Sequence, residues 1–332
     1  MPEEDDLPPP VAPPETLSKA FVLPSKGEVI TSLMTGNSYE IGPELGEGNF
    51  GIVYQCIDVW RNTLAAKVLK PKGTYEKVRQ AAEAEFLKLM KLRHPNITYV
   101  FDAFEYRDTF YIITEHCTLS LADLFGLNQF NGSVWLTPVA RCLLQAVHYL
   151  HINQYAHQDI HLGNVLTAFV KDEMNPAEPG AIQFKLADLG VSRVFSELDA
   201  MNTLNDSIRP PEGIDPKEFG PLDHRIDIYQ TGLVLLQFAY SKTLEFSRQE
   251  VQDGRPREMA LSLPPPLNFA LEKALRRHVM YRTANAMELW RDLNSPDGTA
   301  PALEERPVAD ALTAPQPPVS GPPQGEAPNL LG

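Results

Sequence analysis

Short runs of alternating apolar and polar residues recur through the first third of the chain. A period of two is typical of strands that bury one face. It predicts five strands, at residues 39–45, 51–59, 63–69, 98–104 and 109–116. The runs are short and separated by turn residues, which favours a small antiparallel sheet, and the second half of the chain is predicted to be mostly helical.

One helical pattern interrupts the predicted strands, at residues 74–96. Apolar residues recur there at helical spacing, at Val78, Ala82, Leu89 and Leu92. Glu85 falls on the same stripe, where a carboxylate is costly unless it finds a cation or several donors. Because alternation turns Lys67 inward from its strand, an ion pair between Lys67 and Glu85 is expected. The alternative is an exposed lysine and a glutamate at the helix edge.

Three glycines lie between the first two predicted strands, in the stretch GEGNFG. Gly46, Gly48 and Gly51 allow the backbone to approach a ligand closely and to offer N–H groups to phosphate oxygens. In a dinucleotide-binding fold such a turn opens a helix, whereas another strand follows this one. The order strand, glycine-rich turn, strand therefore favours ATP as the ligand of this turn. It also predicts a lysine in the next strand, where Lys67 lies.

A polar loop with the sequence HQDIHLGNVL occupies residues 157–166. Phosphoryl transfer needs a group that orients or deprotonates the attacking hydroxyl, and oxygen ligands for magnesium. Asp159 and Asn164 have this chemistry, and Asp188, after an alternating run, is expected to lie beside Asn164 through a hairpin. The alternative, metal binding by the two loop histidines, is weaker because magnesium takes oxygen ligands.

Composition narrows the class of protein. The 332 residues are 43% hydrophobic, enough for a domain of about 250 residues. The formal net charge of −14 argues against a nucleic-acid partner, which needs a basic surface. No apolar run reaches the roughly 20 residues of a membrane span, and the three cysteines lack disulfide or zinc spacing. A cytoplasmic protein with no membrane or nucleic-acid partner is expected.

Both ends of the chain have a different composition. Residues 1–17 and 294–332 are rich in proline, alanine and acidic residues and lack apolar periodicity, so they are predicted to be disordered or partly polyproline II. Solvating tails are the simpler interpretation, and a docking site for a proline-binding module is the alternative. Residues 18–38 would lead from the first tail into the domain.

Taken in order, these motifs resemble those of eukaryotic-type (Hanks-type) protein kinases. The similarity covers residues 39–293, with the glycine-rich loop, LAAK for VAIK, HQDIHLGN for the HRD loop, DLG for DFG, and PPE at 210–212 for APE. It implies an α+β, bilobal fold. A small antiparallel β N-lobe with one helix would span about 39–115, and a larger, mainly helical C-lobe about 118–293.

The resemblance also implies roles for individual residues. Lys67, positioned by Glu85, would hold the ATP phosphates; Asp159 would accept the proton of the substrate hydroxyl; Asn164 and Asp188 would bind Mg²⁺, or Mn²⁺ in its place. The nucleotide would lie against the glycine-rich loop, the third strand, the hinge and the C-lobe, at Leu45, Gly46, Glu47, Gly48, Asn49, Phe50, Gly51, Ile52, Val53, Ala65, Lys67, Glu115, Cys117 and Leu166.

The implied function is transfer of the ATP γ-phosphoryl group to a hydroxyl of a protein substrate, most often serine or threonine in this family. A small-molecule phosphotransferase and a catalytically silent nucleotide-binding scaffold are the alternatives. Glu212, which the resemblance pairs with Arg282, and the helix aspartate Asp227 favour a protein-substrate platform. The complete set of catalytic residue types argues against a silent scaffold.

Three positions depart from the kinase pattern. Gln158 replaces the arginine that captures a phosphorylated activation loop, as in non-RD kinases, so the usual switch lacks its receptor. His161, counted here with the catalytic residues, replaces a lysine that contacts the transferred phosphoryl group; it would act as a cation or as a neutral scaffold for the loop. Asn205 replaces a threonine typical of serine/threonine kinases, so acceptor preference rests on family frequency.

Overall fold

The computed structural model describes residues 22–48, 51–70, 79–80, 86, 91–127, 130–170, 180–189, 192–198 and 205–295. Residues 1–17 and 296–332 of the predicted tails lie outside these ranges, as do Asn49, Phe50, Glu85 and Leu89. Within the predicted helix at 74–96, residues 79, 80, 86 and 91 are helical. In the described part of the chain, no helix is both long enough and apolar enough to span a bilayer.

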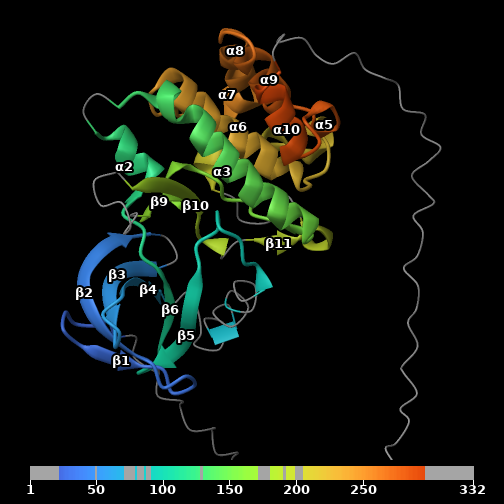
Figure 1. Ribbon diagram of the computed structural model, residues 1–332. Coiled ribbons are helices and arrows are strands. Elements are labelled where there is room, and N and C mark those ends of the chain that lie inside the picture. The colour runs from blue at the N-terminus through green and yellow to red at the C-terminus, as the bar shows by residue number, and fades with distance from the viewer. Residues whose placement is uncertain are drawn as a thin grey trace, which may run out of the picture. The chain divides into compact units, whose positions relative to one another are not determined.

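A six-stranded antiparallel sheet, in the order β1-β2-β3-β4-β6-β5, forms the N-terminal part of the structure (Figure 1). Its strands are β1 (Val29–Thr31), β2 (Ser38–Glu47), β3 (Gly51–Asp58), β4 (Thr63–Leu69), β5 (Val100–Tyr106) and β6 (Thr109–Glu115). The five predicted strands are present, with ends shifted by one or two residues. The sixth, β1, lies in the expected lead-in segment and is too short for alternation to reveal.

The two faces of β4 contribute to different apolar clusters. Ala66 and Val68 are fully buried in a core within the sheet that also contains Ile52, whereas Leu69 joins a larger core that extends among the helices. Because side chains alternate along a strand, Lys67 lies on the face of Leu69. The predicted orientation of Lys67 is therefore confirmed.

The C-terminal part is mainly helical, and the expected α+β architecture is confirmed. Its helices are α2 (Leu121–Phe125), α3 (Gly132–Ile152), α4 (Pro211–Ile214), α5 (Pro216–Phe219), α6 (Arg225–Tyr240), α7 (Arg248–Asp253), α8 (Arg255–Leu261), α9 (Leu267–Ala274) and α10 (Ala286–Leu293). Shorter 3₁₀ turns are η1 (Leu162–Asn164), η3 (Phe195–Glu197), η4 (Asp206–Ile208) and η5 (Val279–Tyr281). Helix α6 is buried along most of its length and packs against α3, α8 and α9, which explains its lack of a polar stripe.

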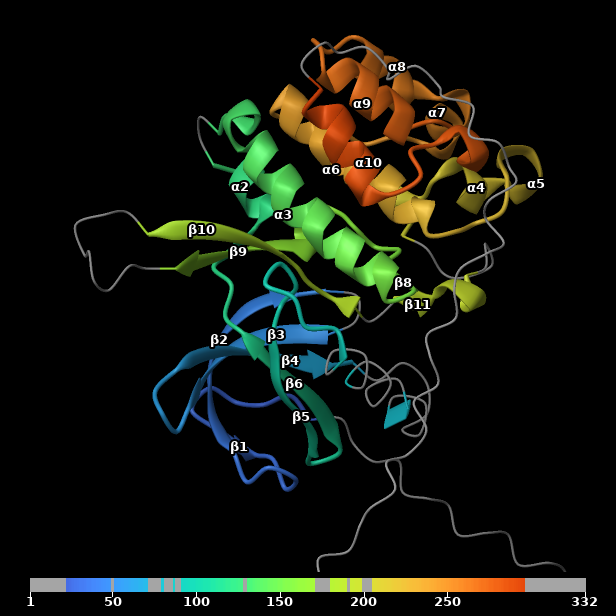
Figure 2. The ribbon, with the colours of Figure 1, turned by 45° about the vertical axis from the view of Figure 1, so that its right-hand side comes forward.

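A β-hairpin lies between the six-stranded sheet and α3 (Figure 2). It consists of β9 (Val165–Val170) and β10 (Ala181–Leu186), with the short β7 (Leu119–Ser120) beside β9; β8 (Tyr155–Ala156) and β11 (Arg193–Val194) pair separately. The Leu186 N–H donates to the Asn96 carbonyl at 2.8 Å, and the Thr98 N–H donates to the Leu186 carbonyl at 3.0 Å. These bonds tie the hairpin to the chain that enters β5.

Candidate active site

The N-terminal turns of α6 hold the polar loop after β8 by its backbone. Asp227 is fully buried and accepts hydrogen bonds from the N–H groups of His157 and Gln158, both at 2.8 Å. Gln230 accepts from the Ile160 N–H at 3.0 Å and donates to the Gln158 carbonyl at 2.9 Å. These bonds keep Gln158 at a φ of 69°, a left-handed conformation that non-glycine residues rarely adopt. Buried side chains of α6 thus hold the backbone of the loop in place.

Asp227 is held in the core as a carboxylate. Burial by itself would raise the pKa of this group, but the hydrogen bond with His151 and the proximity of His151 and His157 outweigh that effect and lower the pKa. The His151 Nε2 atom lies 2.8 Å from the Asp227 carboxylate. A charged acceptor makes the stronger bonds to backbone N–H groups, so ionisation of Asp227 strengthens its hold on the loop.

Asp159, the predicted base, projects from this fixed loop and is mostly buried. The amide nitrogen of Asn164 donates to the Asp159 carbonyl at 2.9 Å and to carboxylate oxygen Oδ2 at 3.0 Å. The amide nitrogen of Asn205, from the distant segment before α4, lies 3.4 Å from the other oxygen, Oδ1. Donors from two segments therefore orient the Asp159 carboxylate.

His161 has a defined ring orientation. Its Nδ1 accepts a hydrogen bond from the Gly163 N–H at 3.0 Å, and its Nε2 lies 3.6 Å from Asp159 Oδ2. A ring nitrogen that accepts carries no proton, so this arrangement assigns the hydrogen to Nε2 and leaves the imidazole neutral. Of the two expected roles, the geometry supports the neutral scaffold.

The hairpin brings the metal-ligand candidates together and joins them to the sheet. The Ala187 N–H donates to the Asn164 carbonyl at 2.8 Å, so Asp188, the next residue, lies near Asn164. Lys67 Nζ lies 2.8 Å from Asp188 Oδ1. Asp188 itself has a φ of 62°, an uncommon conformation for aspartate. The expected ion pair of Lys67 with Glu85 falls outside the described residues.

Strand register decides which predicted nucleotide-binding residues share the face of Lys67. Val53 pairs directly with Lys67 and therefore shares its face, as does Ala65, two residues before it. Ile52 pairs with Val68 and points into the core of the sheet, so only its backbone could contact a nucleotide. Of the other predicted residues, Leu45, Gly46 and Glu47 lie at the end of β2, Gly48 follows them, Gly51 begins β3, and Leu166 lies on β9.

The predicted hinge is anchored on both sides. Glu115 Oε1 accepts from the Tyr99 N–H at 2.7 Å and lies 2.9 Å from Lys185 Nζ, an ion pair with β10 that the sequence did not suggest. Burial, with a smaller contribution from Glu115, raises the pKa of the Cys117 thiol to about 12. Cys117 therefore stays a thiol near neutral pH and is a poor nucleophile.

Sequence interpretation also missed Gln230. It lies three residues after Asp227, inside a helix whose other side chains are largely apolar and buried. A polar side chain in such a run must find partners, since burying it unpaired is costly. That signal was present in the stretch DIYQTG, and the structure identifies its partners as the backbone of Gln158 and Ile160.

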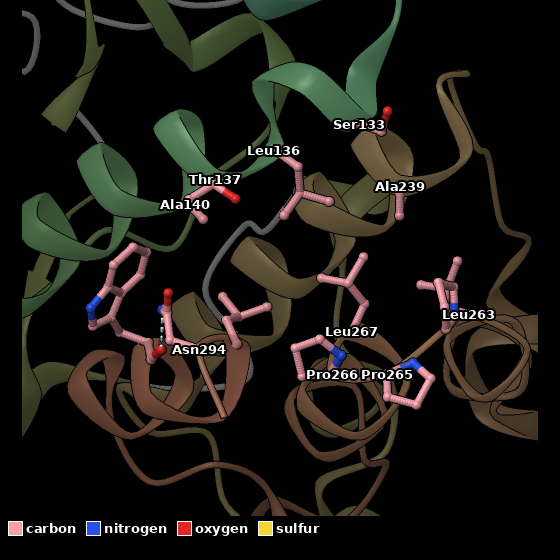
Figure 3. Close-up of a pocket in the computed structure, with 13 residues that line it drawn as sticks. Ser133, Leu136, Thr137, Ala140, Ala239, Leu263, Pro265, Pro266, Leu267 and Asn294 are labelled. Atoms are coloured by element: carbon pink, nitrogen blue, oxygen red, sulfur yellow. Dashed lines mark hydrogen bonds between the residues drawn. The ribbon is translucent and has the colours of Figure 1, made fainter. Parts of the chain in front are cut away.

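A pocket of about 330 Å³ lies in the helical part and is lined mainly by apolar residues of α3, α6, α9 and α10 and of the loop before α9. Figure 3 shows Leu136, Ala239 and Leu267 around it. None of the predicted catalytic, nucleotide-binding or metal-binding residues lines this pocket. Side-chain chemistry, and not this pocket, locates the candidate site.

Comparison with known proteins yields one family and several relatives. The family model of the protein kinase domain matches residues 39–286. A probable serine/threonine-protein kinase of Clostridium acetobutylicum is 24% identical over 279 residues, which are 78% of this chain and 40% of that protein. Serine/threonine-protein kinase 10 of Danio rerio is 28% identical over 294 residues, 82% of this chain and 28% of that protein.

Serine/threonine-protein kinase TAO3 of Mus musculus is 29% identical over 204 residues, 60% of this chain and 21% of that protein. The chain therefore spans less than half the length of these relatives. The family match covers most of the chain, including Lys67, Asp159, Asn164 and Asp188. On this match, and with a β-sheet lobe joined to a helical lobe, the chain belongs to the protein kinase family.

Proposed function

We propose that this chain is a serine/threonine protein kinase that transfers the γ-phosphoryl group of ATP to a hydroxyl of a protein substrate. The observation that carries the proposal is the 2.8 Å contact between Lys67 and Asp188, because it joins the sheet lobe to the hairpin beside Asn164 and Asp159. The names of the relatives support serine or threonine as the acceptor.

Each residue has one task in the proposed reaction. Lys67 holds the phosphates of ATP, and Asp159 accepts the proton of the substrate hydroxyl. Asn164 and Asp188 offer oxygen ligands that suit Mg²⁺, or Mn²⁺ in its place: the amide nitrogen of Asn164 donates to Asp159, so its amide oxygen is the atom it can offer. The ion, when bound, neutralises phosphate charge. His161, whose ring accepts a hydrogen bond from the Gly163 N–H, helps to fix the loop that carries Asp159.

Transfer of labelled phosphate from ATP to a degenerate peptide library tests this function, with Asp159→Asn as the control. We expect label on serine or threonine with the wild-type protein and at least about a hundredfold less with the variant. Label on tyrosine would change the substrate class. Label on small hydroxyl compounds and on no peptide would favour the small-molecule alternative, and binding of ATP without transfer would favour the silent scaffold.

We also propose that the protein acts in the cytoplasm and that the proline-rich segments at 1–17 and 294–332 offer ligands to a proline-binding module. Their PxxP-like composition supports the second point. Titration of synthetic peptides of both segments against a panel of such modules tests it, and peptides in which all prolines are alanine serve as controls.

The segment before α4 carries its own negative charge. Asp206 accepts a hydrogen bond from Arg209 Nε at 2.8 Å and two from Arg248 Nη2, at 2.9 and 2.8 Å. Hydrogen bonds from Arg248 and then Arg209 lower the pKa of Asp206, so it remains ionised at neutral pH. The neighbouring Asn205 reaches Asp159. The exposed Asp206 carboxylate thus ties this segment to Arg248 of α7 without a phosphate.

We therefore expect activity without phosphorylation of this segment. Replacing Ser192, Ser196, Thr203 and Ser207 together by alanine should leave peptide turnover within about threefold of the wild type, because neither Asp206 nor its arginine partners change. Thr203 lies outside the described residues, Ser192 is buried, and Ser196 and Ser207 are exposed. Asp206→Ala is the matched variant and should reduce turnover more than the fourfold substitution. The opposite ranking, with acidic replacements restoring activity, would contradict this expectation.

A further inference from the structure

The orientation of the Asn205 side chain follows from the partners of its two amide atoms. Its carbonyl oxygen, Oδ1, accepts a hydrogen bond from the Ser207 N–H at 3.2 Å and another from the Ser207 hydroxyl at 2.9 Å. A backbone N–H can only donate, so the atom that faces Ser207 must be the amide oxygen. The amide nitrogen is therefore the atom that lies 3.4 Å from Asp159 Oδ1.

Ser207 thus controls, through one side chain, a donor to the proposed base. The Asp159 carboxylate is mostly buried; Asn164 donates to its Oδ2, and Asn205 reaches its Oδ1. Ser207 itself lies in η4 and is exposed. Its hydroxyl is therefore accessible for modification and is linked to the carboxylate by two successive hydrogen bonds.

A phosphoryl group on Ser207 would reverse the preference of the Asn205 amide. The esterified oxygen has no proton to donate to Asn205 Oδ1, and the phosphate oxygens are strong acceptors that carry about 1.5 to 2 negative charges at neutral pH. They repel the amide oxygen and attract the amide nitrogen. The bond from this nitrogen to Asp159 is long, at 3.4 Å, and the phosphate carries the larger charge. Rotation of the amide would bring its oxygen toward Asp159 Oδ1, where two acceptors repel each other.

The arginines of this region are already engaged by another carboxylate. Asp206 accepts hydrogen bonds from Arg209 and Arg248. A phosphate on the next residue would therefore have to compete with Asp206 for these cations. This disfavours the opposite effect, in which arginines capture the phosphate and stabilise the segment.

We propose that Ser207 is an inhibitory phosphorylation site: its modification turns the Asn205 amide away from Asp159 and reduces phosphoryl transfer. This inference rests on the proposed kinase function and adds a means of regulating it. The modifying enzyme is another serine/threonine kinase molecule that uses ATP. The serine Oγ forms a bond to the γ-phosphorus, the bond from that phosphorus to the departing ADP breaks, and the hydroxyl proton goes to the base of the modifying kinase.

The test uses the full chain with phosphoserine incorporated at Ser207 during translation. In the peptide assay, kcat should fall at least about tenfold, because a displaced catalytic group has effects of this size or larger. The KM for ATP should stay within about twofold, since the proposed phosphate-binding residue Lys67 does not change. A phosphatase should restore kcat on the same sample, which excludes misfolding. Phosphoserine at Ser196, an exposed residue of η3, is the matched control for charge and should change kcat less than about twofold.

Asn205→Ala removes the amide through which the phosphate is proposed to act. This substitution alone should lower kcat about three- to tenfold, and phosphate on Ser207 should then reduce kcat by less than about threefold more. Ser207→Ala should stay within about threefold of the wild type, because the backbone N–H still holds the amide. An unchanged kcat on phosphorylation of Ser207, or the same loss in the Asn205→Ala protein, would overturn the inference. Absence of peptide phosphorylation by the wild type itself would instead reject the kinase function.

Discussion

Lys67→Met should reduce phosphoryl transfer by at least about 10²–10³-fold while the protein stays folded. The lost ammonium is the group that holds the phosphates, and removing one such electrostatic contact from an active site has effects of about this size. Methionine keeps the apolar stem of the lysine, so packing beside Leu69 should survive. Peptide turnover at saturating ATP, with circular dichroism and a thermal melt on the same samples, measures both parts of the expectation.

The structure also predicts how stability responds to this substitution. Asp188 loses its 2.8 Å contact with Lys67 but remains partly exposed to solvent, with 24% of its side chain accessible, so the cost of losing that contact is limited. A fall in Tm of no more than a few degrees is expected. Full activity in a folded Lys67→Met protein would show that Lys67 does not hold the ATP phosphates. Unfolding of the variant would show a structural role for the Lys67–Asp188 pair.

Arg282→Met should destabilise the protein by about 3–5 kcal/mol, because it leaves the Glu212 carboxylate buried without its cation. Both side chains are fully inaccessible to solvent, and two parallel bonds join them: Arg282 Nη1 to Glu212 Oε1 at 2.6 Å and Nη2 to Oε2 at 2.7 Å. Arg282 also donates to the backbone carbonyls of Arg225, Arg276 and Arg277. A decrease in Tm of about 10 °C is expected.

A matched exposed pair provides the control. Arg255 and Glu258 lie 3.4 Å apart with more than half of each side chain accessible, so Arg255→Met should change stability by less than about 1 kcal/mol. The double variant Glu212→Leu, Arg282→Met removes both buried charges and should recover part of the loss. Chemical denaturation of the wild type, Arg282→Met, Arg255→Met and the double variant measures these differences in the free energy of unfolding. An Arg282→Met protein as stable as Arg255→Met would show that the buried pair contributes nothing.

Local chain chemistry determined much of the sheet lobe. Alternation in LAAKVL was sufficient to predict that Lys67 and Leu69 share one face and that Ala66 and Val68 share the other, because side-chain direction in a strand depends only on position along the backbone. Glycine spacing was sufficient to locate the turn between β2 and β3. The identities of Asp159, Asn164 and Asp188 limited the chemistry to oxygen ligands and a base.

Tertiary structure alone decided the partners of these groups. Lys67 contacts Asp188, a residue 121 positions away, and Glu115 contacts Lys185 across the hinge. The state of His161 depends on a hydrogen bond from the Gly163 N–H, which no periodicity predicts. The physical reason is that strand and helix periods arise from neighbours along the chain, whereas an ion pair or a buried hydrogen bond forms between whichever groups the packed core brings within about 3 Å.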